Sequence, residues 1–213
     1  MDAWGAAPER RKRPGVDPLK RISVEAAADL AARAFRNAGV GGRDASSAAE
    51  ILALAEAMGI RTHGLNRVRD YVTRINAGGI DPAAEILALR PAPALRHIDG
   101  KDGLGPAVAR RALDEAIGAA REAGIGATFV RRASHLGALA PYLYIAARAG
   151  FAAVVTTNTA PMIAPAGGRS PVVGNNPLGL VVPHPGGQHV LVDMALSVAA
   201  RSRVRAAASQ GAP

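Results

Sequence analysis

The feature that most constrains the fold is an alternation of helical and strand-like patterns, each closed by a glycine or a turn. Some segments repeat apolar residues at helical spacing, and short runs rich in Val, Ile and Leu separate them. The expected helices cover about 23–37, 48–60, 65–76, 106–123 and 139–149. The expected strands cover about 85–90, 94–98, 125–130, 151–157, 178–182 and 189–193. This order predicts a layered α/β fold with an N-terminal helical segment.

Capping side chains indicate where the folded part begins. Ser23 is suited to cap the first helix, and Asp44 or Ser46 the second. Before Ser23, prolines and charges occur without an apolar period, which indicates disorder. The expected organisation is a disordered basic leader at 1–22, a helical part at about 23–80 and an α/β part at about 81–213.

Composition excludes several classes of function. The chain has no cysteine, which excludes disulfides and thiolate chemistry and suits the cytoplasm. No run approaches the ~18 apolar residues of a membrane helix. The net charge of +9 and the basic run at 10–13 raise the alternative of a nucleic-acid partner. Because the other basic residues are scattered without aromatic neighbours, we expect neither nucleic acid nor membrane as partner.

The first candidate group is Thr62-His63-Gly64 with Arg67 and Tyr71. His, Arg and Tyr recur four residues apart, so a helix beginning at this loop would place them on one face. A 2-oxo acid needs a guanidinium for its carboxylate and a proton donor for the oxygen that becomes a hydroxyl. Arg67 suits the first task, and His63, with an ordinary pKa of ~6.5, suits the second. The alternative is a solvated basic helix after a turn histidine.

A second candidate group is the segment Ser-His-Leu-Gly-Ala at 134–138, which follows a predicted strand and precedes a predicted helix. Ligands bind at the carboxyl ends of strands in open α/β sheets. The first N–H groups of the following helix would also be free to bind a phosphate. The alternative is that Ser134 only caps that helix.

Further polar segments follow later strands. Thr-Thr-Asn-Thr ends at Thr159, and Gly174 opens Gly-Asn-Asn-Pro. Such loops suit a flat ring and phosphates, although Gly, Asn and Pro are common in any loop. Asp193 closes an apolar run, where it could orient a nicotinamide amide, orient a histidine or cap a following helix.

Two familiar kinds of site are missing from the sequence. No Gly-x-Gly-x-x-Gly follows a predicted strand, which disfavours a classical Rossmann fold. There is no His-Glu-x-x-His, and His97, His184 and His189 lie apart in turn-like segments. We therefore expect a non-Rossmann fold and no bound metal.

Short blocks follow one another along most of the chain. They are Thr-His-Gly at 62–64 with Arg67 and Tyr71, Asn-Ala-Gly-Gly-Ile at 76–80, Asp-Gly and Gly-Leu-Gly within 99–105, Ser-His-Leu-Gly-Ala at 134–138, Thr-Asn-Thr at 157–159, Gly-Asn-Asn-Pro at 174–177 and Asp-Met-Ala-Leu-Ser at 193–197. In this order they resemble the signatures of the malate/L-lactate dehydrogenase family. The resemblance covers about residues 23–204.

The resemblance implies a non-Rossmann α/β architecture whose mixed sheet binds NAD or NADP, usually in a homodimer. The implied activity is hydride transfer between nicotinamide and a small 2-hydroxy or 2-oxo acid. By position, the catalytic residues would be His63, His135 and Thr62, with Arg67 and Tyr71 binding substrate; either histidine could be the acid or base. The cofactor-binding positions would be His135, Leu136, Gly137, Ala138, Leu139, Thr159, Gly174, Asn175, Asp193, Met194 and Ala195.

The sequence also departs from the family pattern. Thr62 replaces the usual serine, Asn175 replaces threonine, and Ser202-Arg203 stands where Gly-Lys is usual. Family members continue for a further segment that completes the sheet, so we expect 23–213 to be an incomplete domain. The alternative function is a truncated, catalytically inactive fragment that retains partial nucleotide binding.

Overall fold

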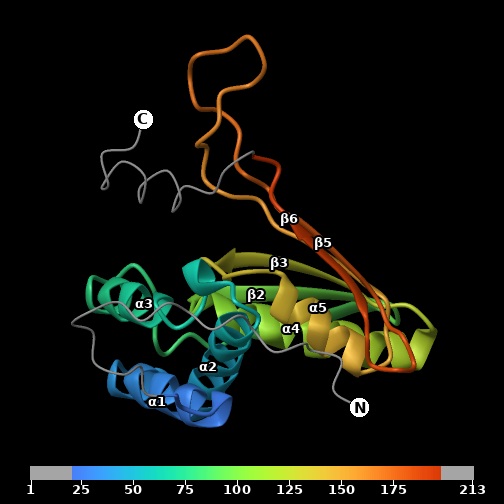
Figure 1. The fold of residues 1–213 in the computed structure, drawn as a ribbon, viewed down its shortest axis with the longest axis horizontal. Coiled ribbons are helices and arrows are strands. Elements are labelled where there is room, and N and C mark those ends of the chain that lie inside the picture. The colour runs from blue at the N-terminus through green and yellow to red at the C-terminus, as the bar shows by residue number, and fades with distance from the viewer. Residues whose placement is uncertain (1–20, 198–213) are drawn as a thin grey trace, which may run out of the picture.

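The computed structural model describes residues 21–197, so most of the expected disordered leader at 1–22 lies outside the described residues. Within that range the chain combines helices with two separate three-stranded sheets. Helices α1, α2 and α3 gather at one end of the molecule (Figure 1). The α/β class and the N-terminal helical segment are therefore confirmed, with two sheets in place of the single mixed sheet that we expected.

The N-terminal helices begin close to their capping signals, with one exception. The elements are α1 (Val24–Asn37), α2 (Gly42–Ala57), the 3-10 turn η1 (Arg61–His63) and α3 (Arg67–Asn76). Ser23 caps α1 as expected, because its Oγ accepts a hydrogen bond of 3.1 Å from Ala26 N–H. The expected cap of α2 is wrong: Gly41 is its N-cap, and Asp44 lies in the first turn, where a carboxylate suits the helix dipole.

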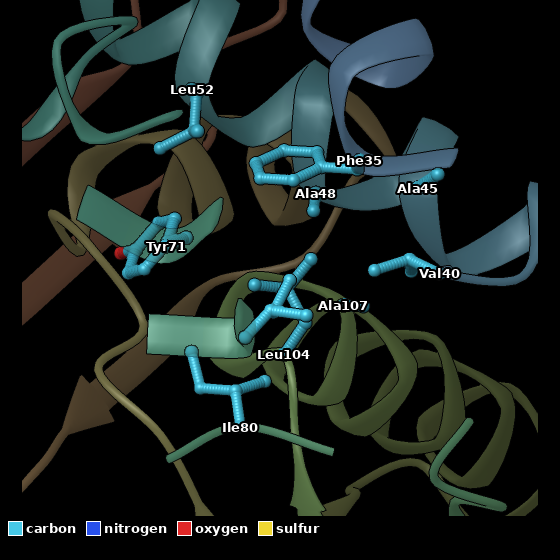
Figure 2. Close-up of a cluster of buried hydrophobic side chains, with 10 residues drawn as sticks. Phe35, Val40, Ala45, Ala48, Leu52, Tyr71, Ile80, Leu104 and Ala107 are labelled. Carbon is cyan, nitrogen blue, oxygen red and sulfur yellow. The ribbon is translucent and has the colours of Figure 1, made fainter. Parts of the chain in front are cut away.

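A packed core joins these helices to the start of the next one. Phe35 of α1, Leu52 of α2 and Tyr71 of α3 contact one cluster with Ile80 and Leu104. Each of the five side chains is at most 3% exposed. Figure 2 shows the Tyr71 ring among them, with its hydroxyl pointing away from the cluster. Burying such side chains contributes about 1.5–3 kcal/mol each, so the core fixes α3 firmly.

The first sheet is mixed. Its strands are β1 (Leu87–Ala92), β2 (Leu95–Gly103) and β3 (Ala127–Ala133). β1 is antiparallel to β2, and β2 is parallel to β3. α4 (Gly105–Ala123) connects β2 to β3 and packs on the sheet through Val108 and Ala112, which contact Ile98. We expected this strand to end at about residue 98, but β2 continues to Gly103.

The second sheet is antiparallel and covered on one face. Its strands are β4 (Ala153–Thr156), β5 (Leu178–Val182) and β6 (Val190–Met194), and α5 (Ala140–Arg148) precedes them. Leu139 and Leu143 pack against Val181 of β5. The other face exposes Val154 and Val190, and the segment between β4 and β5 projects beyond the sheet (Figure 1). None of the helices within 21–197 is long and apolar enough to cross a membrane.

Candidate functional site

Two histidines from distant parts of the sequence meet beside α3. His63 lies in η1, and His135 lies in the loop between β3 and α5. Their rings stack with centroids 5.6 Å apart and planes inclined by 25°. Tyr71 Oη and His135 Nδ1 are hydrogen-bonded at 2.7 Å, and Thr62 Oγ1 lies 3.0 Å from His63 Nδ1. The structure therefore brings together all four residues, two imidazoles with a hydroxyl partner each.

The first candidate group is not arranged as one helical face, so that expectation is wrong. Helix α3 begins at Arg67, and His63 precedes it in the separate turn η1. Gly64 makes the break: an added Cβ would lie 2.3 Å from Glu56 Oε2 and 3.1 Å from Glu56 Cα. The φ of Gly64 is an ordinary −92°. Close approach to Glu56 of α2, and not a left-handed backbone, is why glycine suits this position.

Arg67 lies next to the imidazoles with its guanidinium partly engaged. Its Nε donates to the Thr62 carbonyl at 2.7 Å, and its Nη1 donates to Asp70 Oδ2 at 3.0 Å. The side chain remains 28% exposed. The Nε bond orients the guanidinium, and the edge formed by the two Nη atoms is the side on which an incoming carboxylate could bind.

The surroundings of both imidazoles disfavour the charged form. Burial, followed by the charge of Arg67, lowers the pKa of His63, although Asp193 opposes this shift. Burial and then His63 lower the pKa of His135 to about 4. The His135 residue is nevertheless exposed on one side, where solvent screens the charges around the ring. Burial raises the pKa of Tyr71 above its usual range. At pH 7 both rings are neutral and Tyr71 is protonated.

Asp193 of β6 links the second sheet to this site. Its Oδ2 accepts hydrogen bonds from Leu139 N–H at 3.0 Å and Ala140 N–H at 2.9 Å, at the start of α5. Pro141 has no N–H, and Tyr142 N–H donates to Leu139 O at 3.1 Å. The expected free N-terminus of this helix is therefore wrong, since its donors are occupied. Asp193 therefore caps a helix that precedes it in sequence.

The loop between β3 and α5 carries backbone N–H groups just before the start of α5. Within residues 21–197, the backbone N–H groups of His135, Leu136, Gly137 and Ala138 have no hydrogen-bond partner. Ala138 is only 8% exposed, so its N–H lies in a largely buried position. Four successive donors beside two imidazoles fit a ligand group that is rich in acceptor oxygens.

Ser134 has a different partner from the one we considered. Its Oγ accepts a hydrogen bond of 2.8 Å from Gly105 N–H, at the start of α4, so it does not cap α5. An added Cβ on Gly105 would lie 2.3 Å from His135 O and 2.4 Å from Ser134 O. The β3–α5 loop therefore rests directly on the N-terminal end of α4.

A second hydrogen-bonded group contains Thr159, Gly174 and Asn175. Thr159 Oγ1 accepts from Asn175 N–H at 2.7 Å, and an added Cβ on Gly174 would lie 2.3 Å from Thr159 O. Asn176, which the sequence reasoning missed, accepts from Thr159 N–H through Oδ1 at 3.0 Å and has φ of +36°. Its place in the Asn-Asn-Pro block was the available signal.

The end of β6 connects the two groups along the chain. Asp193 belongs to the first group, and Leu196 N–H donates to Asn175 O at 3.0 Å in the second. Met194 and Ala195 lie between them and are exposed. The segment 193–196 therefore connects the imidazole group with the group around Thr159, Gly174 and Asn175.

The remaining histidines lie elsewhere. His97 pairs with Phe129 across β2 and β3, and His184 N–H donates to His189 Nδ1 at 3.2 Å in the β5–β6 hairpin. The expected turn-like context is wrong for His97, which lies in β2, and right for His184 and His189, which lie in the turn between β5 and β6 but beside each other, not apart. Among residues 21–197, no group of three or more His, Asp or Glu side chains is placed to hold a metal ion.

The structure thus combines a mixed α/β fold with an imidazole pair and an adjacent guanidinium. The chain belongs to the malate/L-lactate dehydrogenase family, whose model matches residues 22–213. It is 35% identical to a malate dehydrogenase of Pyrococcus abyssi over 84% of this chain. It is 33% identical to the ureidoglycolate dehydrogenase (NAD(+)) of Escherichia coli K12 over 89% of this chain.

Solved structures agree with this placement. The malate dehydrogenase of Pyrococcus horikoshii OT3 superposes with a TM-score of 0.81 at 32% identity, covering 87% of this chain and 53% of that one. The delta1-piperideine-2-carboxylate reductase of Pseudomonas syringae gives a TM-score of 0.85 at 28% identity, covering 91% of this chain and 58% of that one. This chain spans about half the length of its relatives, 49% of the P. abyssi protein and 54% of the E. coli protein.

Proposed function

We propose that this protein is an NAD(P)-dependent oxidoreductase that transfers hydride between nicotinamide and C2 of a small 2-hydroxy or 2-oxo acid. The observation that carries the proposal is the stacked pair His63 and His135, each with a hydroxyl partner and with Arg67 alongside. Related proteins are named malate, L-sulfolactate and ureidoglycolate dehydrogenases, whose substrates share this chemistry.

Arg67 would bind the substrate carboxylate through its two Nη atoms, of which Nη1 also donates to Asp70, and this would place the C2 oxygen near the imidazoles. We assign the acid and base role to His63, because the Asp193 carboxylate favours its charged form. His63 would take the hydroxyl proton during oxidation and return it during reduction. His135, held by Tyr71, would hydrogen-bond the same oxygen.

The residues present fit a nicotinamide nucleotide. The N–H groups from His135 to Ala138, which have no partner within residues 21–197, could donate to its amide or phosphate oxygens. Thr159, Gly174 and Asn175, with the segment Asp193 to Ala195, would line its other side. Bound there, the nicotinamide supplies the acceptor or donor of hydride. One relative is named for NAD(+) and another for NADP(+), so either nucleotide suits the family.

The homodimer, the cytoplasmic location and the absence of a nucleic-acid or membrane partner are parts of the same proposal. They rest on the family resemblance and on the scattered distribution of charge along the sequence. Size-exclusion chromatography with light scattering tests the dimer directly.

The central test combines nucleotide binding with turnover. The full chain is titrated with NADH and NADPH by fluorescence, and turnover is assayed with malate, lactate and sulfolactate. His63→Gln and His135→Gln should retain nucleotide binding but lose about 10²–10⁴-fold in kcat, the usual contribution of acid–base catalysis. The matched control is His97→Gln on β2. Full turnover in both site variants would overturn the mechanism.

Binding without turnover in the unsubstituted chain would favour the alternative, a nucleotide-binding protein without catalysis. Arg67→Lys separates substrate from nucleotide. It removes both the fork and the Nε bond to Thr62, so KM for the acid should rise while nucleotide affinity stays constant.

A further inference from the structure

Three residues with side chains adopt left-handed backbone conformations near the His135 loop. They are Lys101 (φ +50°), Asp102 (φ +61°) and Arg132 (φ +51°). Residues other than glycine, asparagine and aspartate rarely adopt this conformation, and such positions persist only where surrounding contacts hold them. Arg132 is three positions before His135, so its conformation decides where that loop starts.

The same residues mark an irregularity between β2 and β3. Asp99 pairs with Arg131, and the next pair is Gly103 with Ala133, so β2 uses more residues than β3 over this interval. Such bulges bend a strand and redirect the residues that follow. An added Cβ on Gly100 would lie 2.6 Å from Arg132 O, so the two strained stretches contact each other through their backbones.

One buried carboxylate touches both stretches. Asp99 is 4% exposed, and its Oδ1 accepts from Arg132 Nε at 2.8 Å and from Lys101 N–H at 3.1 Å. Its Oδ2 accepts from Arg131 Nη2 at 2.9 Å and from a second nitrogen of Arg132. Because Asp99 binds the Arg132 guanidinium at two nitrogens, it holds the orientation of that side chain and also balances its charge.

A short path of contacts continues from this network to His135. Ser134 N–H donates to Gly103 O at 3.4 Å, and Ser134 Oγ accepts from Gly105 N–H at 2.8 Å. His135 follows directly and reaches Tyr71 at 2.7 Å. Asp99 itself is not among the residues that form the imidazole site.

We propose that Asp99 is a positioning residue: by binding Arg132 it holds the left-handed backbone that directs His135 onto Tyr71 and His63. This inference rests on the proposed function for its catalytic meaning, but its geometry can be tested without nucleotide or substrate. When Asp99 is neutralised, the ion pair with Arg132 is lost, and the left-handed backbone at position 132 should be lost with it. A glycine at position 132 is the exception, because glycine adopts that conformation without strain.

The experiment is an NMR titration of the His135 ring in the full chain, assigned by its loss in His135→Gln. His63, Arg67, Arg74 and Asp70 are the charged or titratable groups that act on this ring. In Asp99→Asn the loop loses its anchor, and the His135 pKa should rise by about 1 unit toward the ordinary ~6.5 as the ring becomes hydrated. Glu115→Gln, which weakens the buried pair with Arg96 in the same sheet, is the control and should leave the titration unchanged.

A second pair of variants isolates the backbone. Arg132→Ala and Arg132→Gly both remove the guanidinium, but only alanine is strained at φ +51°. Arg132→Ala should shift the His135 titration, whereas Arg132→Gly should not. Arg132→Gly added to Asp99→Asn should restore the original titration.

Equal titrations in Arg132→Ala and Arg132→Gly, or an unrestored double variant, would overturn the inference even if Asp99→Asn fails to fold. A shifted titration in Glu115→Gln would also overturn it, because any sheet destabilisation would then suffice. Failure of the proposed function is separate. It appears as absent turnover in a chain whose His135 titration still depends on Asp99.

Discussion

The helical end of the molecule and the second sheet place their apolar side chains in opposite ways. Phe35 and Leu52 are 0% exposed within one cluster. On the free face of β4, β5 and β6, Val154 is 68% exposed and Val190 is 66% exposed. Both regions carry candidate site residues, but in the first of them one site residue, Tyr71, belongs to the buried cluster itself.

The two parts of the candidate site therefore depend on different kinds of contacts. Tyr71 is both a core residue and the partner of His135, so the imidazole pair inherits the rigidity of the core. Thr159 and Asn175 instead depend on hydrogen bonds at the projecting end of the second sheet. Regions with few buried apolar contacts open first, so the nucleotide half should respond more readily to ligand than the proton-transfer half.

The largest effect that tests this comparison is a cavity in the core. Leu52→Ala should lower the free energy of unfolding by about 2–5 kcal/mol, because it removes buried methyl groups that have no replacement. The matched substitution Leu196→Ala, at a side chain that is 64% exposed, should change it by about 0.5 kcal/mol or less. Urea denaturation measures both. Similar costs would show that the two regions are not supported differently.

The next effect concerns the contact of α4 with the histidine loop. Gly105→Ala should destabilise the chain by about 1–3 kcal/mol, since its Cβ would meet the His135 and Ser134 carbonyls. Gly118→Ala lies in the same helix with no atom within 4 Å of the new Cβ, and should stabilise by about 0.5–1 kcal/mol. Thermal melting of the two variants compares them. Stabilisation by both would contradict the close approach.

A smaller effect tests the bond between the two regions. Asp193→Asn keeps an acceptor at the start of α5 but loses the negative charge, so we expect a loss of about 1 kcal/mol. Because that charge raises the pKa of His63, the His63 pKa should fall in the variant. Denaturation and NMR titration report the two effects. Asp114→Asn on α4 is the control, and a higher His63 pKa in Asp193→Asn would contradict the assignment.

The smallest effect is a dependence of stability on pH. The folded pKa of both histidines lies below the unfolded value of ~6.5, so the unfolded state binds protons first as the pH falls. The stability that the two neutral histidines contribute is fully present above a pH of ~6.5. It is lost as the pH falls toward about 4, where His135 titrates in the folded state. Because the His135 ring is partly exposed, we expect a loss of about 1 kcal/mol or less. His135→Gln should flatten this part of the denaturation profile, and an unchanged profile would refute its origin.

The sequence predicted those elements whose signals are local. The helix expected at 106–123 is α4 at Gly105–Ala123, and it ends at Gly124 with φ of +78°. The strand expected at 178–182 is β5. The start of α2 was missed because alanines, such as Ala45 and Ala48, form the buried stripe there and carry little hydrophobic pattern.

The candidate site was predicted as a set of residues but not as an arrangement. The family blocks named His63, His135 and Asp193, yet the stacking of the two rings depends on the approach of η1 to the β3–α5 loop, which no spacing in the sequence encodes. The link between Asp193 and the start of α5 is likewise a contact between segments far apart in sequence. Local propensity cannot specify such contacts, because they form only when the tertiary core is complete.

The hydrogen bond between Tyr71 and His135 couples the direction of that bond to the tautomer of the ring. Where the Tyr71 O–H donates to Nδ1 of the neutral imidazole, the ring hydrogen of His135 resides on Nε2. In that tautomer His135 can only donate a hydrogen bond to a ligand at Nε2. When Nδ1–H donates to the Tyr71 hydroxyl instead, Nε2 keeps a lone pair that can take a proton, so one bond switches the ring between donor and acceptor.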